Sequence, residues 1–177
     1  IWMRLAFWWY RPHVFLATSQ AATYKLPPTL GFVYDTVFLD FPKLYANAGK
    51  LARNTKNLVQ SAAHIVTISK SSSKKIQKEY ATADTKISVL YPGVDAVFRP
   101  DGPKYVSNKP YFLYVGAIKP TKNLVNLIKS FALFLEKSLN AYELVIVGST
   151  KGLDTKLLTL IKELKLTKKV IMSGFVE

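Results

Sequence analysis

The sequence predicts an α/β protein built from parallel sheets that are covered by helices. Short apolar runs bounded by turn residues, which are typical of buried strands, alternate with amphipathic helical patterns along the chain. A polar, proline-bearing stretch without periodicity, residues 98–110, interrupts this alternation. We therefore expect two domains, at residues 1–103 and 104–177, each with a doubly wound parallel sheet.

The first domain is expected to begin with an apolar helix, which Arg4, Arg11 and Pro12 interrupt. It falls short of the roughly 20 clean apolar residues that a membrane span needs, so we expect no transmembrane segment. We expect a buried helix of a larger domain, and a helix that rests on a membrane surface is the alternative. The pattern then predicts strands at 13–18, 30–34, 63–68 and 86–91, a helix at 47–61, and a helix capped by one of Ser71, Ser72 and Ser73 that runs to Tyr80.

The pattern is clearest in the second domain. Six apolar residues there have the spacing of one helix face, which predicts a helix at about 122–137. They are Leu124, Leu127, Ile128, Phe131, Ala132 and Leu135. A similar face predicts a helix at about 154–165, and the strands are expected at 111–115, 143–147 and 169–173.

The composition excludes some kinds of site and leaves others open. The chain of 177 residues has no cysteine, and His13 and His64 lie far apart in the sequence, so we expect no metal site. A net charge of +14 favours phosphates, anionic lipids or nucleic acid as partners. Because charge alone does not choose among them, a basic nucleic-acid-binding module and a membrane-surface protein without catalysis stay open as alternatives.

A loop between the first strand and the first helix of the second domain carries the candidate site. It reads GAIKPTKNL and places Lys119 and Lys122 where the helix begins. The start of a helix is already positive, so cations are unfavourable there unless an anion binds. Gly116 lets the backbone approach a ligand closely, and Thr121 is the expected N-cap. A phosphate or diphosphate is the natural ligand, and the alternative is that both lysines point into water.

Several segments in order resemble family 4 glycosyltransferases, which have the GT-B fold. The segment YFLYVGAIKPTKNLVNLIKSFALF resembles the opening of that family's C-terminal domain. The other similar segments are GFVYDTVFLDFP at 31–42, AHIVTISKSS at 63–72, VLYPGVD at 89–95 with Phe98 and Pro100, LVIVGS at 144–149 and IMSGFV at 171–176. The resemblance implies two Rossmann-like domains, both incomplete, in an internal fragment.

The resemblance also implies an activity. It is the retaining transfer of a sugar from a nucleotide-sugar donor to a polysaccharide or lipid-linked acceptor, with no required cofactor. GDP-mannose is the first expectation for the donor, and a UDP-sugar is the second. Residues 1–103 would form the acceptor-side domain and residues 104–177 the donor domain of a cytoplasmic, bacterial enzyme. Peripheral contact with the inner face of the membrane is a further expectation. The fragment alone is expected to be inactive, because the family's E-x7-E segment would follow Glu177.

The resemblance assigns roles to individual residues. Lys122 would stabilise the leaving diphosphate, and Asp35 would contact the acceptor or the sugar, so both are expected to be catalytic. The residues expected to bind the nucleotide are Gly116, Lys119, Thr121, Lys122, Asn123, Gly148 and Ser149. The chain departs from the family where an arginine usually accompanies the lysine, since Ala117 and Thr121 stand there, and Tyr34 replaces the cleft histidine.

Overall fold

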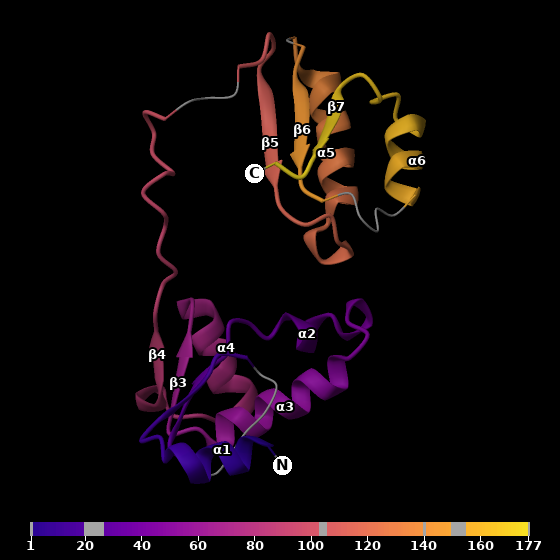
Figure 1. The fold of residues 1–177 in the computed structure, drawn as a ribbon. Coiled ribbons are helices and arrows are strands. Elements are labelled where there is room, and N and C mark those ends of the chain that lie inside the picture. The colour runs from indigo at the N-terminus through magenta and orange to yellow at the C-terminus, as the bar shows by residue number, and fades with distance from the viewer. Residues whose placement is uncertain (1, 20–26, 103–105, 140, 150–154, 177) are drawn as a thin grey trace. The chain divides into compact units, whose positions relative to one another are not determined.

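The computed structural model describes residues 2–19, 27–102, 106–139, 141–149 and 155–176 (Figure 1). The chain divides into two compact units, Ile1–Arg99 and Pro100–Glu177. Each unit contains one parallel sheet and its own helices, which is the predicted fold class.

The first unit contains a sheet of four parallel strands in the order β1-β2-β3-β4. The strands are β1 (Phe15–Ala17), β2 (Thr29–Phe32), β3 (His64–Thr67) and β4 (Ile87–Val89). The helices are α1 (Trp2–Tyr10), α2 (Val37–Asp40), α3 (Ala48–Ser61) and α4 (Lys70–Tyr80), with 3₁₀ turns at Pro42–Leu44 and Asp84–Lys86. All four strands were predicted, although each is shorter than its apolar run, and the short helix α2 was not predicted.

Helix α3 packs closely on the sheet of the first unit. Leu58 on α3 and Ile65 on β3 are fully buried, and a Cβ added to Gly31 on β2 would lie 2.9 Å from Leu58 Cδ1. A side chain at position 31 would therefore force the side chains of Leu58 and Ile65 to shift. Helix α3 and the segment that follows β2 both contribute residues to the cavity described below.

Helix α4 begins earlier than the sequence predicted. The prediction of a cap at residues 71–73 is wrong, because Ser69 caps the helix and its hydroxyl accepts a hydrogen bond from the Ser72 N–H at 3.0 Å. Ser69 has extended backbone angles, which suit an N-cap, whereas the next three serines already belong to the helix. Helix α4 therefore follows β3 after a connection of only two residues, Ile68 and Ser69.

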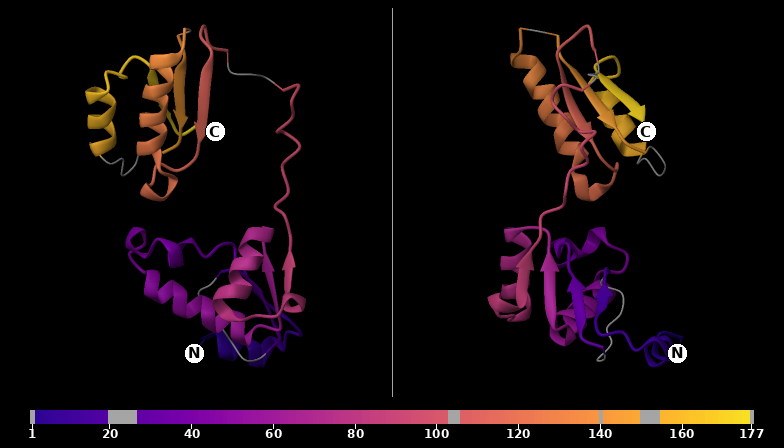
Figure 2. Two further views of the ribbon diagram at one scale, coloured as in Figure 1. Left: turned by 180° about the vertical axis from the view of Figure 1, so that it is seen from behind. Right: turned by 60° about the vertical axis from the view of Figure 1, so that its left-hand side comes forward.

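The second unit contains three parallel strands in the order β5-β6-β7 (Figure 2). They are β5 (Tyr111–Val115), β6 (Glu143–Val147) and β7 (Val170–Gly174), and the helices are α5 (Leu124–Lys137) and α6 (Thr155–Glu163). All five elements lie within two residues of their predicted bounds. Both helices pack on one face of the sheet, because their buried residues share a core with Leu144 and Ile146 of β6.

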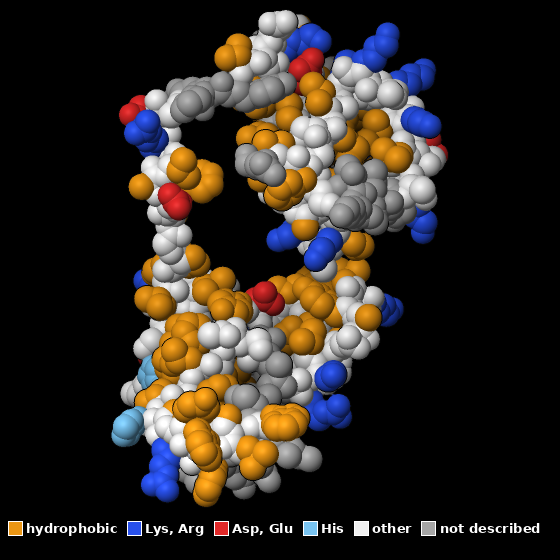
Figure 3. Space-filling model, in the orientation of Figure 1, with side chains coloured by type: hydrophobic (Ala, Val, Ile, Leu, Met, Phe, Trp, Pro, Cys, Tyr) orange, Lys and Arg blue, Asp and Glu red, His pale blue; other side chains and the backbone are white. Residues whose placement is uncertain are grey.

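Hydrophobic side chains gather over α1 on the face of the first unit shown in Figure 3. The α1 residues Trp2, Trp9 and Tyr10 are 85%, 74% and 78% exposed, and Trp8 is also exposed. The prediction that this helix is buried is therefore wrong for these residues in the chain as described. Among the helix side chains whose exposure is described, only Ala6 and Phe7 are partly covered, and Phe7 packs edge-on against Phe15 of β1.

Candidate functional site

The segment after β5 forms a short 3₁₀ turn before helix α5 begins. The turn spans Pro120–Lys122, and within it the Lys122 N–H donates to the Lys119 carbonyl at 2.9 Å. Pro120 stands at the first position of the turn, where its fixed φ is favourable. Both lysine side chains are exposed; Lys119 stands directly before the turn, and Lys122 is its last residue.

The N-cap of α5 is Asn123, so the prediction that Thr121 caps this helix is wrong. Asn123 has a φ of 56° in the left-handed region, which asparagine tolerates better than most residues, and its side chain makes no capping hydrogen bond. The 3₁₀ turn includes Thr121 and moves the helix start past it, because the Asn123 N–H donates to the Pro120 carbonyl at 3.1 Å.

The start of α5 offers hydrogen-bond donors as well as positive charge. The Asn126 N–H donates to the Asn123 carbonyl at 3.1 Å, while the N–H groups of Leu124 and Val125 precede the first possible acceptors within the helix. These N–H groups lie at the positive end of a helix of 14 residues. Together with Lys119 and Lys122, they make a turn that suits a phosphate or diphosphate.

Gly116 and Gly148, two of the predicted nucleotide-binding residues, pack against each other at the ends of β5 and β6. A Cβ added to Gly148 would lie 2.0 Å from the Gly116 carbonyl oxygen, a distance that no side chain could accept. The Gly116 N–H donates to the Val147 carbonyl at 2.9 Å, and the Gly148 N–H donates to the Gly174 carbonyl at 2.8 Å. The backbone therefore continues the sheet one residue beyond β5 and β6.

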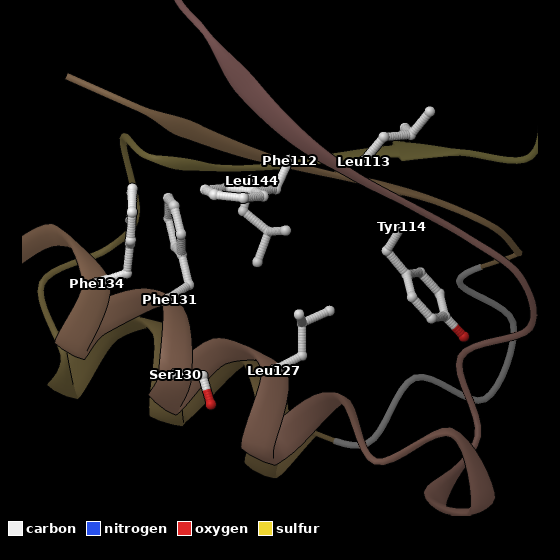
Figure 4. Close-up of a pocket in the computed structure, with 8 residues that line it drawn as sticks. All are labelled: Phe112, Leu113, Tyr114, Leu127, Ser130, Phe131, Phe134 and Leu144. Atoms are coloured by element: carbon white, nitrogen blue, oxygen red, sulfur yellow. The ribbon is translucent and has the colours of Figure 1, made fainter. Parts of the chain in front are cut away.

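Tyr114 is a site residue that sequence reasoning missed. Its hydroxyl donates to the Ala117 carbonyl at 3.0 Å, and Ala117 lies in the loop that leads to the two lysines. Tyr114 also lines a cavity of about 340 Å³ between β5 and α5 with apolar walls that include Phe131 and Phe134. Figure 4 shows the hydroxyl of Tyr114 pointing away from these phenyl rings and toward the loop.

Ser149 follows Gly148 and is exposed at the same edge of the sheet. It engages in an interaction of its own within the chain. The structure therefore brings Gly116, Gly148 and Ser149 to one edge, and the turn with Lys119 and Lys122 begins from that edge. Asp35 is the one predicted site residue that belongs to the first unit.

Asp35 lies beside a cavity of about 520 Å³ at the carboxyl end of β2. Its carboxylate accepts a hydrogen bond from the Val37 N–H at 3.1 Å, which closes a tight turn into α2. The cavity is lined by Ser19, Tyr34, Asp35, Phe38, Tyr45, Asn47, Lys50, Leu51 and Asn54. Aromatic rings, amides and charges of both signs therefore surround a space that a sugar ring would fit.

No group of three or more His, Asp or Glu side chains that could hold a metal ion occurs among the described residues. None of the helices in the described ranges is long and apolar enough to cross a membrane.

The second unit matches a known protein family, and the chain is similar in fold to several solved structures. Residues 100–177 match the family Glycosyl transferases group 1. No curated protein matches the chain by sequence. The crystal structure of Anabaena HepE in complex with UDP and glucose is 15% identical, with a TM-score of 0.73 over 99% of this chain and 51% of that one.

Two further structures are similar. A variant of S. aureus TarM, solved in complex with fondaparinux, α-GlcNAc-glycerol and UDP, is 14% identical, with a TM-score of 0.66 over 92% of this chain and 33% of that one. WaaG, a glycosyltransferase involved in lipopolysaccharide biosynthesis, is 14% identical, with a TM-score of 0.68 over 99% of this chain and 52% of that one.

The likeness to these structures confirms the predicted fold class, which is GT-B-like with parallel α/β units. The chain spans about half the length of HepE and of WaaG, and a third of TarM. At these low identities, the likeness concerns the fold and assigns no role to any side chain.

Proposed function

We propose that this chain is part of a retaining glycosyltransferase of family 4, which moves a sugar from a nucleotide-sugar donor to a saccharide or lipid-linked acceptor. One observation carries the proposal: two exposed lysines stand at the ends of the 3₁₀ turn that leads from β5 directly into the N-terminus of α5. Ligands of open α/β sheets bind beyond the carboxyl ends of the strands, in the connections to the helices. The match of this same unit to the group 1 family supports the choice of a nucleotide-sugar.

The turn has a plain chemical task in such a reaction. When the bond between the sugar and the diphosphate breaks, the leaving diphosphate gains negative charge while the sugar becomes oxocarbenium-like. Fixed cations and N–H groups therefore bind the transition state more strongly than the ground state. Lys122 is the main candidate for this role and Lys119 the second, with Thr121 and Asn123 beside them. The proposed mechanism requires no metal and no cofactor.

The donor nucleotide is proposed to lie along the edge formed by Gly116, Gly148 and Ser149. HepE and TarM were both solved with UDP, which makes a UDP-sugar the first donor to test. GDP-mannose, and with it mannose transfer, stays a proposal from the family resemblance alone. Both donors should be tested in the same assay, because both contain a diphosphate and the same turn of the protein would bind it.

The acceptor is proposed to bind in the first unit, in the cavity beside Asp35. Lys50, Asn54 and Tyr45 line this cavity with Asp35 and provide a cation, an amide and an aromatic ring, which suit hydroxyl groups and sugar faces. Residues 1–103 would thus be the acceptor-side domain and residues 104–177 the donor domain. A polysaccharide or lipid-linked acceptor follows from the resemblance only.

The proposal places the enzyme in the cytoplasm of a bacterium, in peripheral contact with the inner face of the membrane. The exposed aromatic side chains of α1 support contact with a lipid surface, because tryptophan and tyrosine favour the interface between lipid and water. The net charge of +14 would add attraction to anionic headgroups.

The proposal is tested with the full-length protein that contains this chain. Binding of UDP and GDP is measured by calorimetry, and sugar transfer from UDP-glucose and GDP-mannose is measured with and without EDTA. We expect one diphosphate to bind and its sugar to be transferred, with retained anomeric configuration by NMR. The 177-residue chain alone is expected to be inactive. A protein that binds neither diphosphate, but binds DNA or RNA with a steep loss of affinity at high salt, would overturn the proposal.

A further inference from the structure

The backbone at Gly116 and Ala117 is held in place by contacts from both sides. On one side the Tyr114 hydroxyl donates to the Ala117 carbonyl at 3.0 Å. On the other side the Gly116 carbonyl packs on Gly148, at a position where a Cβ would stand 2.0 Å from the oxygen. The Gly116 N–H also donates to the Val147 carbonyl at 2.9 Å. Three consecutive peptide groups are thus held before the chain reaches Lys119.

The position of Tyr114 explains how one strand residue reaches the loop that follows its own strand. Tyr114 and Phe112 lie on the same face of β5, the face that α5 covers, because side chains alternate along a strand. The ring of Tyr114 lies in the apolar cavity that β5 and α5 share, while its hydroxyl reaches out of the cavity toward the loop (Figure 4). The apolar walls hold the ring, and the hydrogen bond from the hydroxyl fixes the Ala117 carbonyl relative to the ring.

The absence of a side chain at Gly148 lets the Gly116 carbonyl pack directly on the backbone at the end of β6. Gly116 has a φ of 153°, which side-chain-bearing residues rarely adopt, and this conformation directs its carbonyl oxygen onto the Cα of Gly148. Any side chain at position 148 must push the Gly116 carbonyl away, and the loop would move with it. Gly148 therefore determines the path of the backbone toward Lys119 and Lys122.

We propose that Tyr114 and Gly148 are positioning residues, which hold the 116–118 segment so that the turn with Lys119 and Lys122 is preorganised for the donor diphosphate. This inference rests on the proposed function, and it changes the predicted role of Gly148 from a nucleotide contact to a residue that acts through Gly116. Preorganisation raises affinity because less conformational entropy is lost when the ligand binds. It also keeps the cations aligned with the leaving group.

The first test is Tyr114→Phe in the full-length protein, since this change keeps the ring in its cavity and removes only the hydroxyl. We expect the KM for the donor and the dissociation constant of the diphosphate to rise about three- to tenfold, the loss expected for one hydrogen bond. The KM for the acceptor should stay within about twofold. Tyr142→Phe is the matched control, because Tyr142 is a half-buried tyrosine of the same unit whose ring stacks on Phe112 at 5.6 Å. It should leave both constants unchanged.

The second test compares Gly148→Ala with Gly93→Ala. A Cβ at Gly93 would meet nothing within 4 Å, whereas a Cβ at Gly148 would meet backbone. We expect Gly148→Ala to weaken diphosphate binding at least tenfold and Gly93→Ala to leave it unchanged. If Gly148→Ala does not fold, Tyr114→Phe still decides the matter. Hydrogen exchange of the unliganded protein adds a readout that needs no ligand: Tyr114→Phe should speed exchange in the peptide that spans 116–122, while Tyr142→Phe should not.

The outcomes separate this inference from the proposed function. If the wild-type protein binds a diphosphate but Tyr114→Phe changes neither the donor constants nor the exchange rate, the positioning role is wrong and the proposed function stands. If donor and acceptor constants change together with the melting temperature, the hydroxyl serves stability alone and the inference is overturned. A wild-type protein that binds no diphosphate overturns both proposals.

Discussion

Lys122→Ala should have opposite effects on function and on stability. A charge-assisted hydrogen bond to a phosphate contributes roughly 1.5–3 kcal/mol, which corresponds to about 10- to 150-fold in binding. Lys122 is exposed, so solvent weakens this contact, and we expect turnover to fall about tenfold, at the lower end of this range. Without ligand, however, the lysine repels the positive start of α5. Its removal should therefore stabilise the unliganded protein by some tenths of a kcal/mol.

Lys137→Ala is the matched control, because it removes the same charge from the other end of the same helix. Helix α5 has 14 residues, so its ends are about 20 Å apart, more than twice the screening length of about 8 Å at physiological salt. Lys137 lies in the last turn, where a cation stabilises the helix. We expect Lys137→Ala to leave turnover within about twofold and to lower stability slightly.

The assay is sugar transfer at saturating acceptor, combined with urea unfolding of the unliganded proteins. The prediction requires a loss of turnover that is specific to Lys122→Ala and stability changes of opposite sign in the two variants. Equal losses of turnover would show that the total charge acts, rather than a contact at the turn. Unchanged turnover in Lys122→Ala would remove this residue from the mechanism.

Two further predictions concern the first unit. Ser69→Ala should lower the free energy of unfolding by about 1 kcal/mol, because the Ser69 hydroxyl accepts a hydrogen bond from the Ser72 N–H and caps α4. Ser71→Ala should have a much smaller effect. Urea unfolding of both variants checks this prediction. Burial raises the pKa of Tyr80 above its usual value of 10.0. The folded protein then holds this proton more tightly than the unfolded chain, so stability should fall as the pH rises past 10. Tyr80→Phe should make that fall less steep in urea unfolding at several pH values, and parallel curves would contradict the assignment.

Periodic apolar patterns carried most of the fold prediction. Strands β5 and β6 were predicted with their observed bounds, since each is a run of five residues that ends directly before a glycine. The helix starts were less accurate, because a cap depends on backbone angles that several neighbouring polar residues could adopt. Four serines occur between residues 69 and 73, and only the conformation of Ser69 shows which of them is the cap of α4.

At the candidate turn, too, the sequence predicted the location of the helix start but not the residue that caps it. The location of the turn and its two lysines were predicted from the sequence, but Thr121 was chosen as the cap by residue type. Proline at position 120 starts a 3₁₀ turn instead, and the left-handed conformation of Asn123 then begins the helix. For α1, a buried helix was preferred to a surface helix for a different reason: an apolar pattern shows that a surface avoids water, but it does not show what covers it.

The contact between Gly116 and Gly148 follows from strand register. Tyr111 pairs with Glu143 and Val115 with Val147, so the two strands run in parallel at a constant offset, and one residue further Gly116 lies opposite Gly148. The sequence contains this relation, because YFLYVG and ELVIVG each end in valine and glycine after four further residues. What it does not contain is the choice of β6 as the neighbour of β5. Once that pairing is known, two glycines at one edge imply a close approach of backbone to backbone, and the loop that bears the two lysines begins at that approach.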